Sequence, residues 1–218
     1  ITRFEEEPPD SARTAFRELI RRRVEGWPVA YLVGEKEFFS RPFKVSPDVL
    51  IPRSETEELV ERALAFLSNR SNQNLLTRVL DIGTGSGAIA ITIALENPIL
   101  EVTASDISES ALEIARHNAA DLKATNVKLI HSNLFSAFAS PAPDHPTHAA
   151  TQVDSALDDS DFTPTPTFRK PDRAKNSAMP WQFDLIVSNP PYIQAGDEHL
   201  SQGDLRFEPS MALTDHAD

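Results

Sequence analysis

A glycine-rich turn between two apolar runs constrains the fold more than any other feature of the chain. The run RVLDI (78–82) favours a strand, and GAIAITIALEN (87–97) favours a helix. Between them stand three of the seven glycines in the chain, Gly83, Gly85 and Gly87. Glycine permits a tight turn with a close approach of the backbone, and the start of a helix offers free N–H groups. We therefore expect this turn to bind a ligand.

The alternation of strand and helix continues along the chain. Further strands are predicted at 100–105, 127–131 and 183–188, and a further helix at 108–120. Alternating units of this kind form a parallel, doubly wound α/β sheet of the Rossmann-like type. In such a sheet the strand at 183–188 lies beside the first strand. Its carboxyl end then faces the same crevice as the glycine turn.

The residues before the first strand of this sheet predict a different organisation. Apolar residues at helical spacing indicate an amphipathic helix at 11–25, and β-prone pieces at 30–52 indicate one or two hairpins. Ser54 is predicted to begin the next helix, with Glu57 completing a capping box.

A segment between the third and fourth strands does not fit the pattern of a packed domain. Residues 141–180 hold seven of the 17 prolines and no glycine, and most of the others are Ser, Thr, Asp or Ala. Such a segment buries too little apolar surface to offset the entropy of ordering it. We interpret it as a disordered insertion.

Composition and charge exclude several classes of protein. The absence of cysteine excludes disulfides, a thiol nucleophile and thiolate metal sites, and we expect no metal. A net charge of −12 argues against broad binding to the phosphates of a nucleic acid. No apolar run approaches the length that crosses a bilayer, so we expect no membrane association.

Two cofactors remain open for the glycine turn. Gly83, Gly85 and Ala88 satisfy the dinucleotide fingerprint, with Asp106 near the place of its ribose-binding acid, which favours a nicotinamide cofactor. Asp81, just before the first glycine, suits a cationic ligand better than a pyrophosphate. The order D-x-G-x-G-x-G also resembles that of methyltransferases that bind S-adenosylmethionine. In those enzymes Asp81 would organise the loop near the amino-acid end of the cofactor, and Asp106 would hold both ribose hydroxyls.

The likeness to these methyltransferases extends to the end of the third strand. Asn133 and Leu134 fall where such enzymes contact the adenine, Asn133 at the amino group and Leu134 on the ring face. The predicted cofactor-binding residues are Asp81, Gly83, Thr84, Gly85, Ser86, Gly87, Asp106, Asn133, Leu134 and Asn189.

The fourth strand ends in a rigid kink, the sequence Asn189-Pro190-Pro191-Tyr192. Two prolines stiffen the chain, and proline keeps a carbonyl acceptor while it lacks a donor. The oxygen of Asn189 and the carbonyl of Pro190 are suited to accept both N–H groups of a planar amide or amine, with the ring of Tyr192 against its face. We predict that Asn189, Pro190 and Tyr192 are catalytic. The kink is interpreted as a clamp for a planar nitrogen nucleophile.

Longer stretches resemble the HemK/PrmC family, the methyltransferases that modify the glutamine of the GGQ motif in class-one peptide-chain release factors. The stretches are PVAYLVGEKEF (28–38), VLIPRSETEELVERAL (49–64), VLDIGTGSGAIAI (79–91), DISESALEIARHNA (106–119), FDLIVSNPPYI (183–193) and LRFEPSMAL (205–213). NPPY alone is shared with methyltransferases of nucleic-acid amino groups. The stretches IPRSETE and FEPSMAL are more particular to this family.

The resemblance implies a seven-stranded methyltransferase sheet behind a small helical substrate-recognition domain. We expect 1–30 to be the end of that domain and 31–52 a β-hairpin linker. The methyltransferase domain would occupy 53–218, truncated after the fourth strand.

The resemblance also implies a cofactor, a substrate and a partner. The cofactor would be S-adenosylmethionine and the partner a release factor, methylated by a monomer without stable nucleic-acid binding. The implied substrate-binding residues are Arg53, Asn189, Pro190, Pro191 and Tyr192.

Because compact bacterial members lack the insertion, we expect a eukaryotic source and a mitochondrial location, with the cytoplasm second. Two alternatives stay open: an amino-methyltransferase of nucleic-acid bases, and an inactive cofactor-binding fragment.

Overall fold

The computed structural model describes residues 7–68, 77–139 and 182–214. The insertion predicted at 141–180 lies outside the described residues. The chain divides into two compact units, one of residues 1–137 together with 183–218 and one of residues 138–182. The elements described below belong to the first unit.

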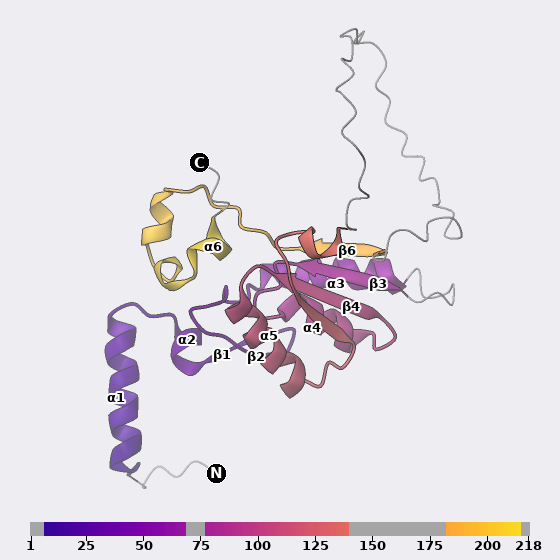
Figure 1. Cartoon of the computed structure of the whole chain (residues 1–218). Coiled ribbons are helices and arrows are strands. Elements are labelled where there is room, and N and C mark those ends of the chain that lie inside the picture. The colour runs from indigo at the N-terminus through magenta and orange to yellow at the C-terminus, as the bar shows by residue number, and fades with distance from the viewer. Residues whose placement is uncertain (1–6, 69–76, 140–181, 215–218) are drawn as a thin grey trace, which may run out of the picture. The chain divides into compact units, whose positions relative to one another are not determined.

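Among the described residues, four parallel strands form the central sheet (Figure 1). They are β3 (Arg78–Ile82), β4 (Glu101–Asp106), β5 (Val127–His131) and β6 (Leu185–Ser188), and their order across the sheet is β5-β4-β3-β6. The predicted parallel α/β fold is confirmed. The fourth strand of the sheet lies beside the first, as the alternation predicts.

Three helices flank this sheet, and the central one is buried. They are α3 (Glu55–Ser68), α4 (Ala88–Glu96) and α5 (Glu109–Asp121). Helix α4 contacts both α3 and α5 as well as strands β3, β4 and β5. Every residue of 88–94 is buried. Because α4 has neighbours on so many sides, it lacks the polar face of an ordinary surface helix.

The largest core cluster joins the sheet, these helices and a hairpin. The hairpin consists of β1 (Glu35–Phe38) and β2 (Arg41–Lys44), which pair antiparallel. Phe38 and Phe43 belong to the same buried cluster as Val79, and their two rings meet edge to face with centroids 6.0 Å apart. The hairpin is therefore packed onto the same core as the parallel sheet.

The turn of the hairpin is anchored to α3 by Glu57. Phe39 and Ser40 adopt positive φ angles of 52° and 58°, which is typical of a two-residue hairpin turn. The N–H of Phe39 donates to Oε1 of Glu57 at 2.8 Å. The side chain of Glu57 thus binds the hairpin turn and not the start of its own helix. The capping box predicted with Ser54 is wrong. Only the main chains of these two residues pair, from N–H of Glu57 to the carbonyl of Ser54 at 3.0 Å.

Two helices precede the hairpin. Helix α1 (Asp10–Val24) confirms the helix predicted at 11–25, although none of its residues is buried. Helix α2 (Val29–Val33) stands where a β-prone piece was expected, so that part of the prediction is wrong. Pro28 precedes its first turn and Gly34, with φ of 84°, ends it. These signals at both ends outweigh the β propensity of a five-residue segment.

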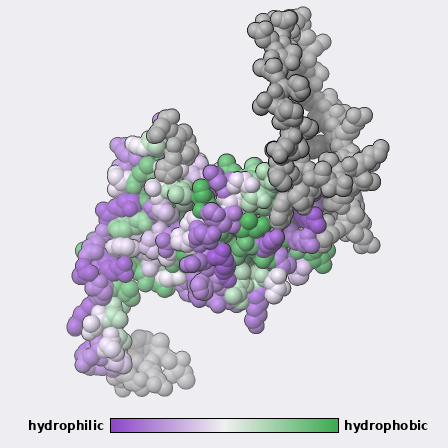
Figure 2. All heavy atoms as spheres, viewed as in Figure 1, coloured by the Kyte–Doolittle hydropathy of each residue, from purple (hydrophilic) through white to green (hydrophobic). Residues whose placement is uncertain are grey.

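After β6 the chain folds back through short helical turns. They are the 3₁₀ turns Glu198–Ser201 and Leu205–Phe207 and helix α6 (Ser210–Leu213). The N–H of Ile193 donates to the carbonyl of Leu213 at 3.0 Å, which brings the end of this segment back to its start. Within the described part of the chain, no helix has the length and apolar character to span a membrane. Hydrophilic residues cover much of the face seen in Figure 2, with hydrophobic patches among them.

Candidate active site

The predicted site residues follow directly on the ends of neighbouring strands. Ile82, the last residue of β3, is paired with Ser105 in β4 and with Ser188 in β6. The residues that come next in the three segments are Gly83, Asp106 and Asn189. Carboxyl ends of parallel strands meet at one edge of the sheet. The register therefore gathers the glycine turn, the acid and the Asn-Pro-Pro-Tyr kink at one edge.

Two of the glycines border open space. Gly83 and Gly85 have φ angles of 72° and 55°, and a Cβ added to either would meet no atom within 4 Å. The N–H groups of Gly83 and Thr84 both donate to the carbonyl of Ser105, at 2.8 and 3.0 Å. The loop is thus attached to strand β4 through Ser105, while the side of Gly83 and Gly85 where a Cβ would stand is open. This arrangement fits the close approach of a cofactor to the backbone.

The third glycine has a different role. Gly87 lies at the N-cap of α4 with φ of 83°. A Cβ there would come within 2.6 Å of Cδ1 of Ile91 and within 3.2 Å of Cβ of Ala115. Gly87 therefore serves the packing of α4 against α5. Its predicted contact with the cofactor stays a prediction.

Asp81 is completely buried behind the loop. Its Oδ2 accepts a hydrogen bond from Oγ1 of Thr84 at 2.7 Å, and its Oδ1 has no hydrogen-bond partner among the described residues. Burial raises the pKa of Asp81 to about 7, although the bond from Thr84 acts in the opposite direction. Because solvent does not reach this carboxyl, its geometry fits a role in organising the loop. Direct contact with the cofactor stays a prediction.

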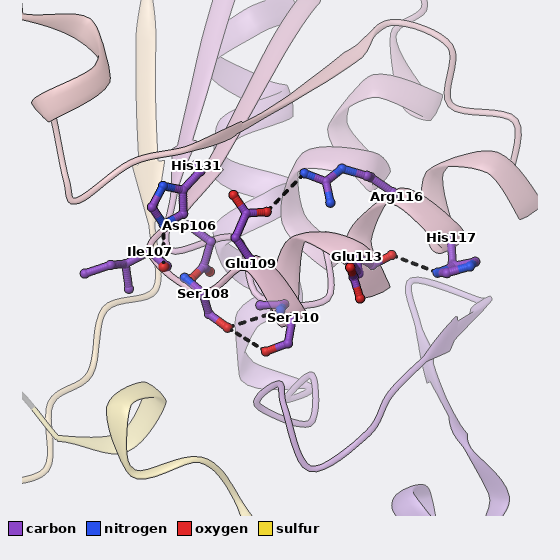
Figure 3. Close-up of polar contacts among 10 residues, drawn as sticks. Asp106, Ile107, Ser108, Glu109, Ser110, Glu113, Arg116, His117 and His131 are labelled. Carbon is purple, nitrogen blue, oxygen red and sulfur yellow. Dashed lines mark hydrogen bonds and ion pairs between the residues drawn. The ribbon is translucent and has the colours of Figure 1, made fainter.

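Asp106 is half-buried at the turn from β4 into α5 (Figure 3). Its Oδ2 accepts from N–H of Gly85 at 2.8 Å, and its Oδ1 accepts from N–H of Ser108 at 2.9 Å. These bonds fix the carboxylate at the front of the glycine loop. Each carboxylate oxygen can accept more than one hydrogen bond, so both remain able to bind hydroxyl groups.

The loop after β5 presents Leu134 to solvent. Leu134 has φ of 48° and its side chain is 64% exposed. The hydroxyl of Ser132 donates to the carbonyl of Leu134 at 2.8 Å, and N–H of Asn133 donates to Oγ of Ser136 at 3.1 Å. A positive φ is a strained conformation for a leucine, and such strain is concentrated at functional sites. The predicted contacts of Asn133 and Leu134 with the adenine fit this geometry.

The Asn-Pro-Pro-Tyr kink has free polar and apolar surface. Asn189 is half-buried, and its side chain forms no hydrogen bond with any described residue. Tyr192 is 79% exposed. A cavity of about 350 Å³ has Arg53, Pro190 and Tyr192 in its wall. Three predicted substrate residues thus share one cavity, whereas Asn189 and Pro191 are not part of its lining.

The sequence analysis did not identify Glu208 as a site residue. Its side chain is fully buried, and its Oε1 lies 2.5 Å from Nη2 of Arg53. Its Oε2 accepts from N–H of Ile51 at 3.2 Å. Glu208 belongs to the stretch FEPSMAL, so its place in that stretch was the available signal.

The sequence analysis also did not identify Asn118, a buried residue of α5. Its Nδ2 donates to the carbonyls of Ser86, at 2.8 Å, and of Lys44, at 3.1 Å. Its Oδ1 accepts from N–H of Lys44 at 2.7 Å. Asn118 therefore joins the glycine loop to strand β2. The only signal in the sequence was a polar residue on the buried face of an amphipathic helix.

Two family comparisons agree with this geometry. Residues 74–201 match the family described as methyltransferase domain, and residues 1–34 match the PrmC N-terminal domain. The first match covers more than half of the chain. The chain belongs to the methyltransferase domain family. The predicted fold class is confirmed by this match and by the parallel sheet.

Curated relatives of this methyltransferase domain protein are release factor glutamine methyltransferases. The protein of that name from Neisseria gonorrhoeae is 47% identical over 218 residues, 100% of this chain and 63% of the relative. Those from Bordetella pertussis and Salmonella typhimurium are 43% and 41% identical, over 94% and 98% of this chain and 59% and 61% of the relatives. These matches confirm the resemblance to the HemK/PrmC family. The chain spans about three fifths of the length of these relatives.

Proposed function

We propose that the whole protein transfers a methyl group from S-adenosylmethionine to the side-chain amide nitrogen of a glutamine, the one in the GGQ motif of a class-one peptide-chain release factor. The names of the curated relatives support this proposal. The observation that carries it is the position of Asn189. Asn189 follows the strand beside the glycine loop, and its side chain has no hydrogen-bond partner among the described residues. The next residue, Pro190, lines a cavity.

The residues of the glycine loop fit S-adenosylmethionine. Open space in front of Gly83 and Gly85 admits a ligand to the backbone, and Asp106 offers acceptors for ribose hydroxyls. The exposed side chain of Leu134 offers an apolar surface for an adenine. When bound, this cofactor supplies an electrophilic methyl group. A nicotinamide cofactor is not favoured, because the chain belongs to the methyltransferase domain family.

The kink would hold the glutamine amide as a nucleophile. The lone pair of an amide nitrogen is delocalised, so its orientation matters. Oδ1 of Asn189 and the carbonyl of Pro190 are suited to accept its two N–H groups, and the exposed ring of Tyr192 is suited to pack on its face. Rigid prolines hold the acceptors in place before the substrate arrives. No strong general base is required, because the extra proton can pass to water after transfer.

The test is to identify the residue that receives the methyl group. Full-length protein would be incubated with labelled S-adenosylmethionine and a release factor, and the product analysed by mass spectrometry. We expect label on the GGQ glutamine alone, and none on a release factor with that Gln replaced by Ala. Label on the adenines of an oligonucleotide, or on no substrate, would contradict the proposal.

Three finer expectations are part of the proposal and await their own measurements. We expect a monomer, and the net charge of −12 argues against stable nucleic-acid binding. Among residues 7–68, 77–139 and 182–214, no group of three acidic or histidine side chains is placed to hold a metal ion. The mitochondrial location stays a prediction, and the three relatives named above come from bacteria.

A further inference from the structure

We propose that Glu208 is a positioning residue of the substrate site. Its buried carboxylate would fix Arg53 at the cavity wall, where the guanidinium binds the main-chain carbonyls of the peptide around the target glutamine. This inference rests on the proposed function, because the peptide is that of the release factor. It adds a residue and a role that neither the sequence nor the names of the relatives provide.

The contacts of Glu208 are the first argument. Its side chain is 0% exposed, and each of its two carboxylate oxygens has a different partner. Oε1 pairs with Nη2 of Arg53 at 2.5 Å, and Oε2 accepts from N–H of Ile51 at 3.2 Å. A buried carboxylate is stable only when it is paired and hydrogen-bonded. Glu208 therefore holds both the main chain and the side chain of the stretch Ile-Pro-Arg.

A second anchor holds the other end of the same stretch. The hydroxyl of Tyr31 donates to the carbonyl of Val49 at 2.6 Å. Burial above all, and then the negative charge of Glu208, raise the pKa of Tyr31, so the phenol remains a donor. Val49 and Ile51 are 1% and 5% exposed. Residues 49–53 are thus fixed from two sides, by α2 and by the segment that carries Glu208.

The guanidinium of Arg53 has donors left for a ligand. Its side chain is 32% exposed and lines the cavity with Pro190 and Tyr192. Glu208 is the only hydrogen-bond acceptor that it meets among the described residues. A guanidinium carries several N–H donors in a planar fork, so most of them remain available to carbonyl oxygens. The two glycines of a GGQ sequence have no side chains to cover their carbonyls.

The rest of the cavity wall is largely apolar. Its wall contains the apolar residues Leu50, Ile193, Leu205, Ala212 and Leu213. Asp204, also in the wall, lies 3.7 Å from Arg23. The paired and partly exposed Arg53 is therefore the donor-rich group of this wall. A salt bridge serving stability alone would not require Arg53 to line the cavity and to stay partly exposed.

The test separates substrate binding from catalysis and from stability. Full-length wild-type protein would be compared with Glu208→Gln, which keeps the shape and removes the charge, and with Arg53→Lys, which keeps the charge and removes the fork. Glu198→Gln is the matched control, because Glu198 lies exposed in the same segment. Steady-state methylation of the release factor gives KM and kcat, calorimetry gives the Kd of S-adenosylmethionine, and circular dichroism monitors folding.

Both test variants should raise the KM for the release factor by about 10-fold or more, and change kcat and the cofactor Kd by less than about 2-fold. The variant with both substitutions should be little worse than either single one, because the residues act as a unit. Glu198→Gln should behave as wild type. If Glu208→Gln does not fold, the KM of Arg53→Lys for the release factor tests the inference, because this variant keeps a cation opposite Glu208.

Two results would contradict the inference in different ways. Folded variants with wild-type KM and only a lower Tm would reduce Glu208 to a structural role and leave the proposed function intact. Wild-type protein that methylates no glutamine would overturn the proposed function, and the substrate role of Glu208 with it.

Discussion

At the scale of single residues, Asp81 is a buried carboxyl group that holds its proton more tightly than a free aspartic acid does. Burial raises its pKa from 3.8 to about 7. Between these values the unfolded chain has lost the proton that the folded protein keeps, so the free energy of unfolding falls as pH rises. The loss is at most about 1.4 kcal/mol per pH unit, and it ends above the folded pKa.

Asp81→Asn should abolish this part of the pH dependence, because the amide does not titrate. Urea unfolding of the cofactor-free protein from pH 4.5 to 8 measures it. We expect the stability of the wild type relative to Asp81→Asn to fall as pH rises toward 7, and then to level off. Parallel curves for the two proteins would mean that Asp81 is already ionised at low pH in the folded state.

At the scale of elements, the glycines of the turn have two different functions. Gly83 leaves open space for a cofactor, and Gly87 allows α4 to pack against α5. Gly83→Ala places a methyl group in open space at φ of 72°, whereas Gly87→Ala places one 2.6 Å from Ile91 at φ of 83°. Gly87→Ala should therefore lose more stability, about 1–3 kcal/mol, through overpacking at the start of α4. Gly83→Ala should lower cofactor affinity about 10-fold or more with a smaller loss of stability.

Thermal unfolding and calorimetry with S-adenosylmethionine distinguish the two glycine variants. Equal losses of affinity in both folded variants would show that Gly87, too, contacts the cofactor. Unchanged affinity in Gly83→Ala would contradict the open space as a cofactor site.

Local patterns predicted the elements of the sheet well. The sequence predicts β3 and β5 with the bounds that the structure has. Strand β3 is a short, buried apolar run that ends at a glycine turn, which is the pattern of a central parallel strand. Strand β5 lies at the edge of the sheet and is only partly buried, and its β-prone residues were enough to predict it. Helix α2 was missed, since in a five-residue helix the end signals decide more than the β-prone residues. The partners of Glu57 and Glu208 were also beyond prediction. Their acceptor oxygens bind groups 18 and 157 residues away, which no local pattern encodes.

At the scale of the whole molecule, the segment after β6 joins the N-terminal helix to the site. The rings of Trp27 and Phe207 lie with centroids 4.8 Å apart, and the guanidinium of Arg206 donates to the carbonyl of Glu25. Glu208, which follows Phe207 in the chain, holds Arg53 at the cavity. Residues 1–34 match a PrmC N-terminal domain. The segment after β6 therefore links the N-terminal region, which is expected to recognise the substrate, with the cavity that is expected to hold the glutamine.

The central claim is that the kink after β6 orients a glutamine amide, and the most direct measurement is the methylation rate of Asn189→Ala. Single-turnover transfer to a release factor would be followed in full-length protein, with Tyr192→Phe and Tyr192→Ala beside it and calorimetry of S-adenosylmethionine as control. We predict that Asn189→Ala folds, retains most of its cofactor affinity and loses methyl transfer by about 100-fold or more, because the lost contact acts on alignment in the transition state. Tyr192→Phe should be milder than Tyr192→Ala, since the ring face packs on the amide. Transfer by Asn189→Ala at the wild-type rate would contradict the account.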